Sequence, residues 1–158
     1  MVLRRTIEIH ASGIHASPGS SAGAAFFRDP LPSDETLIAE VQPTIHPALF
    51  CHRHQTDQLM VLRGSIDLIV VQNRQLHCIT LREDEATWVR IPPCVPHGAI
   101  NRGRTAAIVV NAVLRHRPSD GKDYQARPLP PALVATWSAM QHSDLRSGGP
   151  VSEVVDHT

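Results

Sequence analysis

The chain has 158 residues, the size of one ordinary domain, which is long enough to bury about two thirds of its unfolded surface without disulfide or metal staples. Its 15 Lys and Arg residues balance 15 Asp and Glu residues, and its isoelectric point is about 7.2. A chain without net charge has no global field that attracts nucleic acid or anionic membranes. We therefore expect neither as a partner, and a small molecule recognised locally instead.

The cysteines and the start of the chain predict a cytoplasmic location. Cys51, Cys78 and Cys94 are odd in number and share no Cys-x-x-Cys spacing, which argues against a secreted disulfide framework and a Cys-rich zinc site. The first residues, "MVLRRTIEIH", are partly basic but no apolar run follows them, and no stretch approaches about 18 apolar residues. We expect neither a signal peptide nor a membrane span.

Residues 1–35 are the least specified part of the chain. "TIEIH" alternates like a short strand, "ASPGSSAG" has the composition of a loop, and the two prolines of "DPLPSD" break any regular element. We expect this segment to pack on the body of the domain or on a partner subunit.

Residues 36–116 carry short runs rich in β-branched residues and separated by turn residues. The runs are "TLIAEVQ", "ALFCHRH", "QLMVLRG", "SIDLIVVQ", "QLHCITL", "ATWVRIP" and "AAIVVNAVLRH". Strands at this spacing predict an all-β domain, a sandwich or barrel of two antiparallel sheets. Within "IVVQNRQLHCI" we predict a hairpin about Asn73, because Asn tolerates the left-handed conformation of tight hairpin turns.

Residues 117–158 begin with the polar, proline-rich connection "RPSDGKDYQARPLPP". The next stretch, "PPALVATWSAMQHSD", places Leu133, Trp137 and Met140 at the spacing of one helical face, with proline where a first turn tolerates it. We predict a short helix that packs on the barrel or on a second subunit, followed by a loose tail, "RSGGPVSEVVDHT".

The stretch "CHRHQTDQ", residues 51–58, has the composition of a metal site. If it is one continuous strand, His52, His54 and Gln58 share one face and Asp57 lies on the other, unless a bulge intervenes. His97, in the later stretch "IPPCVPHGAIN", is expected to fold back beside them. Imidazole nitrogens suit iron, zinc, copper or nickel, and an amide oxygen can complete the shell.

These two stretches resemble the paired motifs of the cupins, small β-barrels. The first cupin motif runs Gly, His-x-His, three or four residues, Glu, then Gly, and the second runs Pro-x-Gly-x-x-His-x-x-x-Asn. Here they read His52-Arg-His54-Gln-Thr-Asp-Gln58 followed by Gly64, and Pro92-Pro-Cys94-Val-Pro-His97-Gly-Ala-Ile-Asn101. The resemblance covers roughly residues 36–115 and implies a double-stranded β-helix, or jelly roll, with the short helix outside it. It also implies a homodimer.

The resemblance further implies one divalent transition metal, Fe, Zn, Ni or Mn, held by His52, His54, Gln58 and His97. Gln58 stands where cupins usually have Glu, the gap to Gly64 is one residue short, and Cys94 replaces the usual Gly. If the alignment slips by one residue, Asp57 is the alternative ligand. Some cupins instead use a pocket histidine as a base without a metal. We expect the pocket to be lined by Met60, Leu62 and Ile100, with Asn101 at its margin.

A second resemblance is to cupins related to the dTDP-4-keto-sugar 3,5-epimerases. It is carried by "IPPCVPHGAIN", by the strand ending in "VVNAVLRH" and by "RPSDGKDY". Those epimerases also use a pocket lysine and a tyrosine acid, whereas "QLMVLRG" has no Lys and Tyr124 falls in the polar segment beyond the barrel. Two functions stay open, with the catalytic residues unassigned. One is an isomerase-like, epimerase-like or dioxygenase-like enzyme acting on a small oxygenated molecule such as a sugar nucleotide, and the other is a binding or sensing module without turnover.

Overall fold

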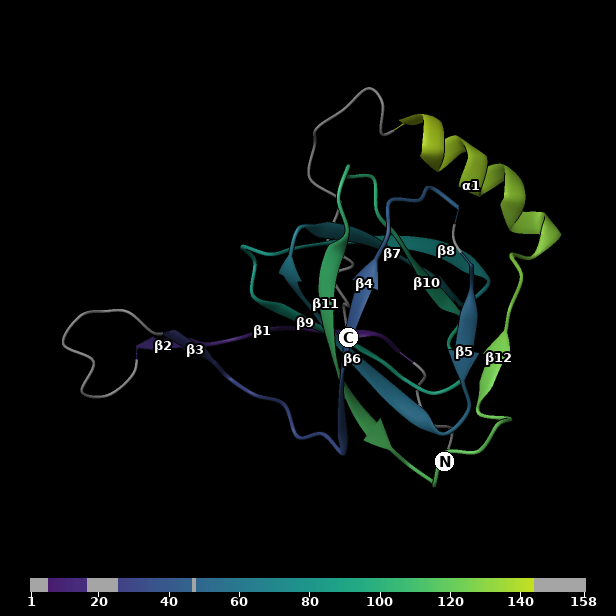
Figure 1. Ribbon diagram of the computed structural model, residues 1–158. Helices are drawn as coiled ribbons and strands as arrows, with labels where there is room; N and C mark the ends of the chain where they lie inside the picture. The colour runs from purple at the N-terminus through teal and green to yellow at the C-terminus, as the bar shows by residue number, and fades with distance from the viewer. Residues whose placement is uncertain (1–5, 17–25, 47, 144–158) are drawn as a thin grey trace, which may run out of the picture.

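Two five-stranded antiparallel sheets face each other in the computed structural model, which describes residues 6–16, 26–46 and 48–143 (Figure 1). The first sheet has the order β1 (Glu8–Ala11), β9 (Thr87–Ile91), β6 (Gln55–Arg63), β11 (Ala107–Arg115) and β4 (Glu35–Val41). The second has the order β12 (Tyr124–Ala126), β5 (Phe50–His52), β10 (His97–Ile100), β7 (Ser65–Gln72) and β8 (Gln75–Arg82). The all-β, jelly-roll prediction is confirmed. The expectation of a closed barrel is wrong, because no ladder of the described residues joins one sheet to the other.

The hairpin between β7 and β8 forms where the sequence predicts it. Asn73 and Arg74 have φ values of 52° and 61°, the left-handed pair that a two-residue turn needs to match the twist of its strands. Gly64, between β6 and β7, has a φ of 82°, and a Cβ there would lie 3.3 Å from the Cβ of Ala107. The turn therefore needs glycine for both its backbone conformation and its space.

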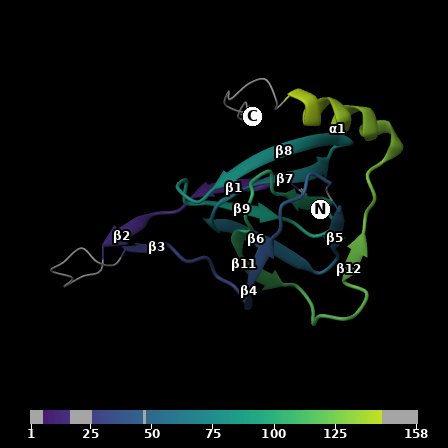
Figure 2. The same cartoon turned by 45° about the horizontal axis from the view of Figure 1, so that its top comes forward.

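Apolar side chains pack in three places. The main cluster fills the space between the sheets and includes Val61, Leu68, Val70, Val89, Ile91 and Val109. A second cluster lies on the outer face of the second sheet, where Trp137 of helix α1 (Pro131–Ser143) packs on Leu49, Ile69 and Ile100. Figure 2 shows α1 lying over β8 of this sheet. A third, on the outer face of the first sheet, contains Met60, Trp88 and Ala112. The predicted helix is therefore confirmed, and it packs on this chain's own sheet.

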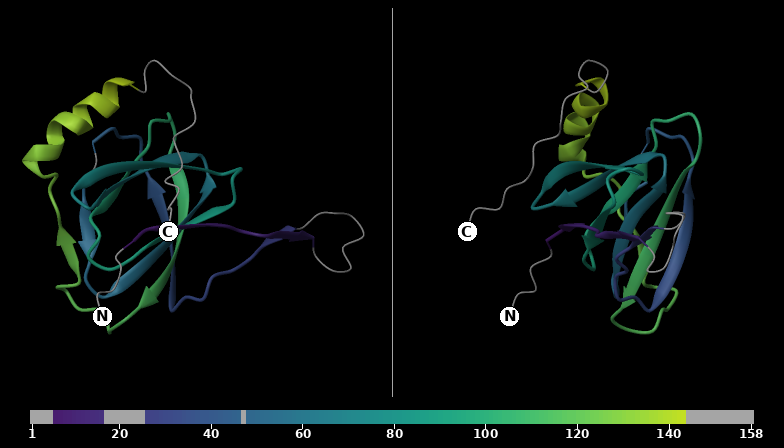
Figure 3. Two further views of the ribbon diagram at one scale, coloured as in Figure 1. Left: turned by 180° about the vertical axis from the view of Figure 1, so that it is seen from behind. Right: turned by 90° about the vertical axis from the view of Figure 1, so that its left-hand side faces the viewer.

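The amino-terminal segment is divided between the first sheet and an extension. Strand β1 pairs with β9 from Glu8 opposite Arg90 to Ala11 opposite Thr87. The two-stranded sheet of β2 (Ile14–Ala16) and β3 (Phe26–Arg28) projects beyond the body of the molecule (Figure 3). Most of "ASPGSSAG" and the carboxy-terminal tail lie outside the described residues. In the described part of the chain, no helix has the length and hydropathy needed to cross a membrane.

Candidate functional site

Asp57, and not Gln58, faces the histidines. Its Oδ2 lies 3.3 Å from Nε2 of His97 and 3.9 Å from Nε2 of His52. The Gln58 amide points away from them: Nε2 donates to the carbonyl oxygens of Pro32 and Ala112 at 3.0 and 2.7 Å. Its Oε1 accepts from Nε of Arg90 at 3.1 Å. The prediction that Gln58 joins the histidines while Asp57 faces outward is therefore wrong.

The error has a structural cause. Strand β5 ends at His52 and β6 begins at Gln55, so residues 53 and 54 form a bend between two strands. Alternation of side chains holds only within one continuous strand. Because the bend resets the alternation, Asp57 and His52 come to share the space between the sheets.

The Asp57 carboxylate is buried, and both of its oxygens contact polar side chains. Its Oδ1 accepts from Nε2 of Gln55 at 2.6 Å and from Nδ2 of Asn111 at 2.8 Å. Burial raises the pKa of Asp57, but the hydrogen bond and charge of His97, the Asn111 amide and the charge of His52 outweigh burial and hold the pKa below its ordinary value. The site therefore contains a fixed negative charge at neutral pH.

His97 is held in one orientation. It lies at the start of β10, and its Nδ1–H donates to the carbonyl oxygen of Val95 at 2.9 Å. The ring packs against Phe50, with the centroids 4.6 Å apart. Nδ1 lies against a carbonyl oxygen and Nε2 lies against Asp57, so contacts at both ring nitrogens hold the ring in place.

His52 pairs with a carboxylate that the sequence analysis did not single out. Its Nδ1 lies 3.2 Å from Oδ2 of Asp123, which is only 4% exposed. The other oxygen of Asp123 accepts from the backbone N–H groups of Arg53 and His54 at 3.1 and 2.7 Å. Asp123 reaches this place because Tyr124 pairs with His52 in the β12–β5 ladder. The signal in the sequence is "RPSDGKDY", which is similar to the epimerases but contains two aspartates, Asp120 and Asp123, and does not by itself indicate which of them has a role.

The predicted four-ligand metal site does not assemble. Gln58 is engaged elsewhere, and the hydrogen bonds of His54 run through its backbone, from N to Asp123 and to its carbonyl from the N–H of His116. Across residues 6–16, 26–46 and 48–143, no group of three or more His, Cys, Asp or Glu side chains is arranged to hold a metal ion. The arrangement of these side chains does not fit the metal that the cupin resemblance implies. Metal binding itself stays a prediction, to be tested by experiment.

The predicted pocket lining is also wrong. Met60 and Leu62 share the outward face of β6 with Gln58: Met60 packs against Trp88, and Leu62 is 46% exposed. Ile100 faces Trp137 of α1 on the outer side of the second sheet. Asn101 donates from Nδ2 to the carbonyl oxygens of Val41 and Thr105, so it fastens a loop beyond the far end of β10.

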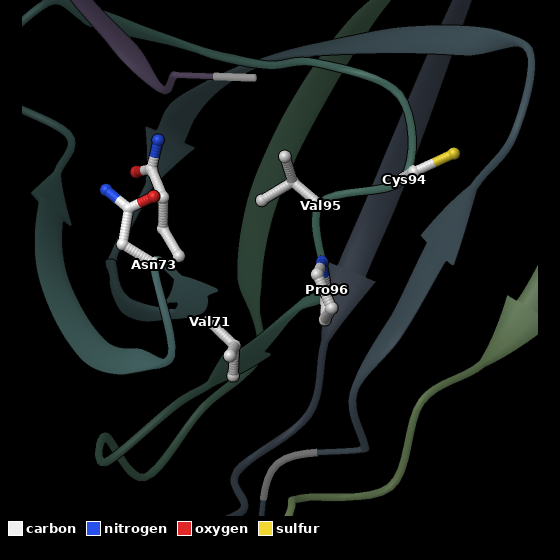
Figure 4. A pocket seen from close by; sticks show the side chains of 6 residues that line it. Val71, Asn73, Cys94, Val95 and Pro96 are labelled. Carbon is white, nitrogen blue, oxygen red and sulfur yellow. The ribbon is translucent and has the colours of Figure 1, made fainter. Parts of the chain in front are cut away.

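The loop before His97 links the site to a neighbouring hollow. The N–H of Cys94 donates to the carbonyl oxygen of His52 at 2.6 Å, and Cys94 has a φ of 63°, the left-handed value that explains the usual glycine here. The hollow, of about 210 Å³, is lined by Val71, Gln72, Asn73, Cys94, Val95 and Pro96 (Figure 4). One loop thus fixes His52 and His97 and also forms a wall of the hollow.

Comparison with known proteins identifies the fold. No model of a known family matches the chain, and no curated protein does. Solved structures do. A dTDP sugar isomerase from Desulfovibrio desulfuricans G20 is similar with a TM-score of 0.63 and 22% identity, over 84% of this chain and 90% of that one. A dTDP-4-dehydrorhamnose 3,5-epimerase from Sulfolobus tokodaii is similar with a TM-score of 0.60 and 14% identity, over 76% of each chain.

A third similar structure is a mutant of the 3,4-ketoisomerase QdtA from Thermoanaerobacterium thermosaccharolyticum, in complex with TDP-4-keto-6-deoxyglucose. Its TM-score is 0.59 and its identity 13%, over 92% of this chain and 98% of that one. The chain therefore has the cupin fold. Within that fold, its structural neighbours are dTDP-sugar epimerases and ketoisomerases, as the second sequence resemblance predicts.

Proposed function

We propose that the protein is a sugar-nucleotide isomerase or epimerase that moves a proton at a carbon beside a keto group. The observation that carries the proposal is the His52–Asp123 pair, with 3.2 Å between Nδ1 and Oδ2. Support comes from the structural neighbours, which include a 3,5-epimerase and 3,4-ketoisomerases of TDP sugars. Both reaction types begin with loss of a proton next to a carbonyl.

The pair suits His52 to the role of base. Since a carboxylate oxygen only accepts hydrogen bonds, the contact with Asp123 places the ring proton on Nδ1 and leaves the Nε2 lone pair free. Two backbone N–H groups hold Asp123 through its other oxygen, so the carboxylate cannot turn away. Asp123 is thus a positioning residue that fixes the reactive tautomer of His52.

The proposed step moves one proton and one electron pair. Nε2 of His52 takes the proton from the carbon beside the carbonyl, the C–H pair forms a carbon–carbon double bond, and the carbonyl π pair moves to oxygen as an enolate. For ketoisomerisation, the imidazolium gives the proton to the carbon that carried the keto oxygen, and the hydroxyl of the first carbon loses its proton to the enolate oxygen, so the keto group moves by one carbon. For epimerisation, a water molecule on the opposite face gives a proton to the first carbon, and the imidazolium loses its own proton to the hydroxide that remains. Asp123 at Nδ1 and Asp57, 3.9 Å from Nε2, both stabilise the imidazolium by their negative charge.

Solvent-exchange measurements test the proposal. Incubated with TDP-4-keto-6-deoxyglucose in D₂O, the protein should introduce deuterium at the carbon beside the keto group, as followed by proton NMR and mass spectrometry. His52→Asn should slow this exchange by at least about 100-fold, since general bases contribute roughly 10²- to 10⁴-fold. His46→Asn, which alters an exposed histidine in the β4–β5 connection, is the matched control and should exchange normally.

Two results would count against the enzyme. If His52→Asn exchanges deuterium as fast as the unaltered protein, His52 is not the base. Tight binding of the sugar nucleotide without any exchange in the unaltered protein would favour the binding or sensing module.

We also propose a homodimer, supported by the exposed apolar residues of β4. Strand β4 lies at the edge of the first sheet, and its Leu37 and Ile38 are 43% and 70% exposed. An unpaired edge with apolar side chains is a ready site for association of a second strand. Light scattering should give twice the chain mass, and Ile38→Lys should reduce it. A monomer at micromolar concentration in the unaltered protein would overturn this.

A further inference from the structure

Tyr124 is an exposed aromatic ring beside the proposed base. It is 56% exposed, although it belongs to a strand of the second sheet. It lies directly opposite His52 in the β12–β5 ladder, and paired residues project from the same face of a sheet. The Tyr124 ring therefore lies on the inner face of edge strand β12, at the margin of the space between the sheets.

The ring is held by its neighbours. Phe50 stacks against it with the centroids 5.1 Å apart and an angle of 27° between the planes. His52 meets it nearly edge-on, with the centroids 5.9 Å apart and an angle of 69°. Phe50 covers one face of the Tyr124 ring, and the exposure leaves the other face open. A ring held in place before a ligand arrives loses little conformational entropy when the ligand binds.

We infer that the open face of Tyr124 is a stacking platform for the hexose ring on which the proposed reaction takes place. The inference rests on the proposed function. A proton can be taken only from a carbon within about 3 Å of Nε2 of His52. A hexose in that position lies next to the Tyr124 ring, whose centroid is 5.9 Å from that of His52. The C–H face of a sugar is apolar and packs well on an aromatic face.

The nucleotide part of the substrate is then directed elsewhere. A diphosphate separates the sugar from the nucleoside, so a base cannot occupy the same platform while the sugar lies at His52. The inference therefore makes a distinction that can be measured: a ligand with a sugar should perturb Tyr124, and a nucleotide without one should not.

The composition of the chain allows a direct measurement, because Tyr124 is its one tyrosine. Biosynthetic labelling with 3-fluorotyrosine therefore gives a single fluorine NMR resonance from this ring. TDP-glucose, which has no keto group and cannot react, should shift the resonance, whereas TDP alone should shift it by less than a quarter as much at equal saturation by calorimetry. Equal shifts with both ligands, or no shift when TDP-glucose is bound, would overturn the inference.

Steady-state kinetics distinguish a stacking role of the Tyr124 ring from a role of its hydroxyl as a general acid. Tyr124→Phe keeps the ring and should stay within about 3-fold of the unaltered protein in kcat and KM. Tyr124→Leu keeps bulk without an aromatic face and should raise KM about 10-fold with little change in kcat, the upper end of what contact with an aromatic face contributes. Val134→Ala, at an exposed position of helix α1 on the outer side of the second sheet, is the control and should leave both constants unchanged. A large loss of kcat in Tyr124→Phe would show that the hydroxyl acts, and would overturn the platform.

The two proposals fail in different ways. If TDP-glucose shifts the fluorine resonance but no keto sugar exchanges deuterium, the platform stands and the isomerase does not. If deuterium exchange depends on His52 but TDP-glucose does not shift the fluorine resonance, the isomerase proposal stands and the platform does not.

Discussion

The replacement of Asp123 by Asn should change the tautomer of His52 and leave the rest of the fold as it is. The two side chains have nearly the same shape, and the amide oxygen of Asn can still accept from the backbone N–H groups of Arg53 and His54. The amide nitrogen would then face Nδ1 of His52 as a donor. His52 would have to accept there, which moves its own proton to Nε2 and removes the lone pair that acts as the base.

The expected loss of activity is large and the loss of stability small. A histidine base left in the wrong tautomer costs about 10⁴-fold in the well-studied serine proteases, and we expect about 10³- to 10⁴-fold here. Asp123→Ala should behave differently. It leaves two backbone donors without their carboxylate partner, so it should also lower the free energy of unfolding by about 2–4 kcal/mol.

The assay combines deuterium exchange, thermal unfolding and nitrogen NMR of the histidine rings, with His52→Asn used to assign the resonance. Asp120→Asn, in the same connection but with an exposed side chain, is the control and should keep full exchange. If Asp123→Asn exchanges within about 10-fold of the unaltered protein while His52 shows the Nε2–H tautomer, the assignment of Asp123 as a positioning residue is refuted.

Three further predictions follow from the same contacts. Because the pKa of Asp57 lies below its ordinary value of 3.8, its contribution to stability is present above that value and is lost as the pH falls through the lowered pKa; Asp57→Asn should flatten the acid limb of a plot of Tm against pH, and an unchanged limb would contradict this. Gln58→Glu should lower the free energy of unfolding in urea by about 2–4 kcal/mol, since the carbonyls of Pro32 and Ala112 lose their donor and would face a buried carboxylate instead, while exposed Gln75→Glu should be neutral; a tolerated Gln58→Glu would show that Gln58 is not held as described. Exchange should survive exhaustive chelation, because the proposed base needs no metal; its loss, with recovery on adding Fe, Zn, Ni or Mn, would restore the metal site predicted from His52, His54 and His97.

Local patterns predicted the elements well. The hairpin at Asn73 depends on two residues that adopt a left-handed turn, and the helix about Trp137 depends on spacing within one segment. Each of these signals lies within a few residues of the structure that it forms. The cupin motifs predicted that His52 and His97 lie close together, and the centroids of their rings are 6.5 Å apart. This long-range prediction was possible because the family pattern pairs two motifs that are distant in sequence.

The pocket residues failed for a different reason. Met60 and Ile100 are apolar residues close in sequence to the predicted ligands, and the sequence alone does not say which face of a sheet is the inner one when both faces are covered. Here the outer face of the first sheet has its own apolar cluster, and helix α1 covers the second. Two buried faces make apolar residues a poor guide to the site. Burial of polar side chains does not single the site out either, because Gln58 on the outer face is as buried as Asp57 on the inner face.

The misplacement of Gln58 and the omission of Asp123 have one origin. Arg53 and His54 leave the strand geometry, and their N–H groups turn to the carboxylate of Asp123, while the N–H of Arg53 also lies 3.0 Å from the Asp123 carbonyl oxygen. A contact between residues 69 and 70 positions apart thus forms the bend that ends β5. The same carboxylate orients His52 through its second oxygen. The interaction that prepares the proposed base is therefore also the one that turns Asp57 inward, and the sequence about His52 cannot reveal either effect without its distant partner.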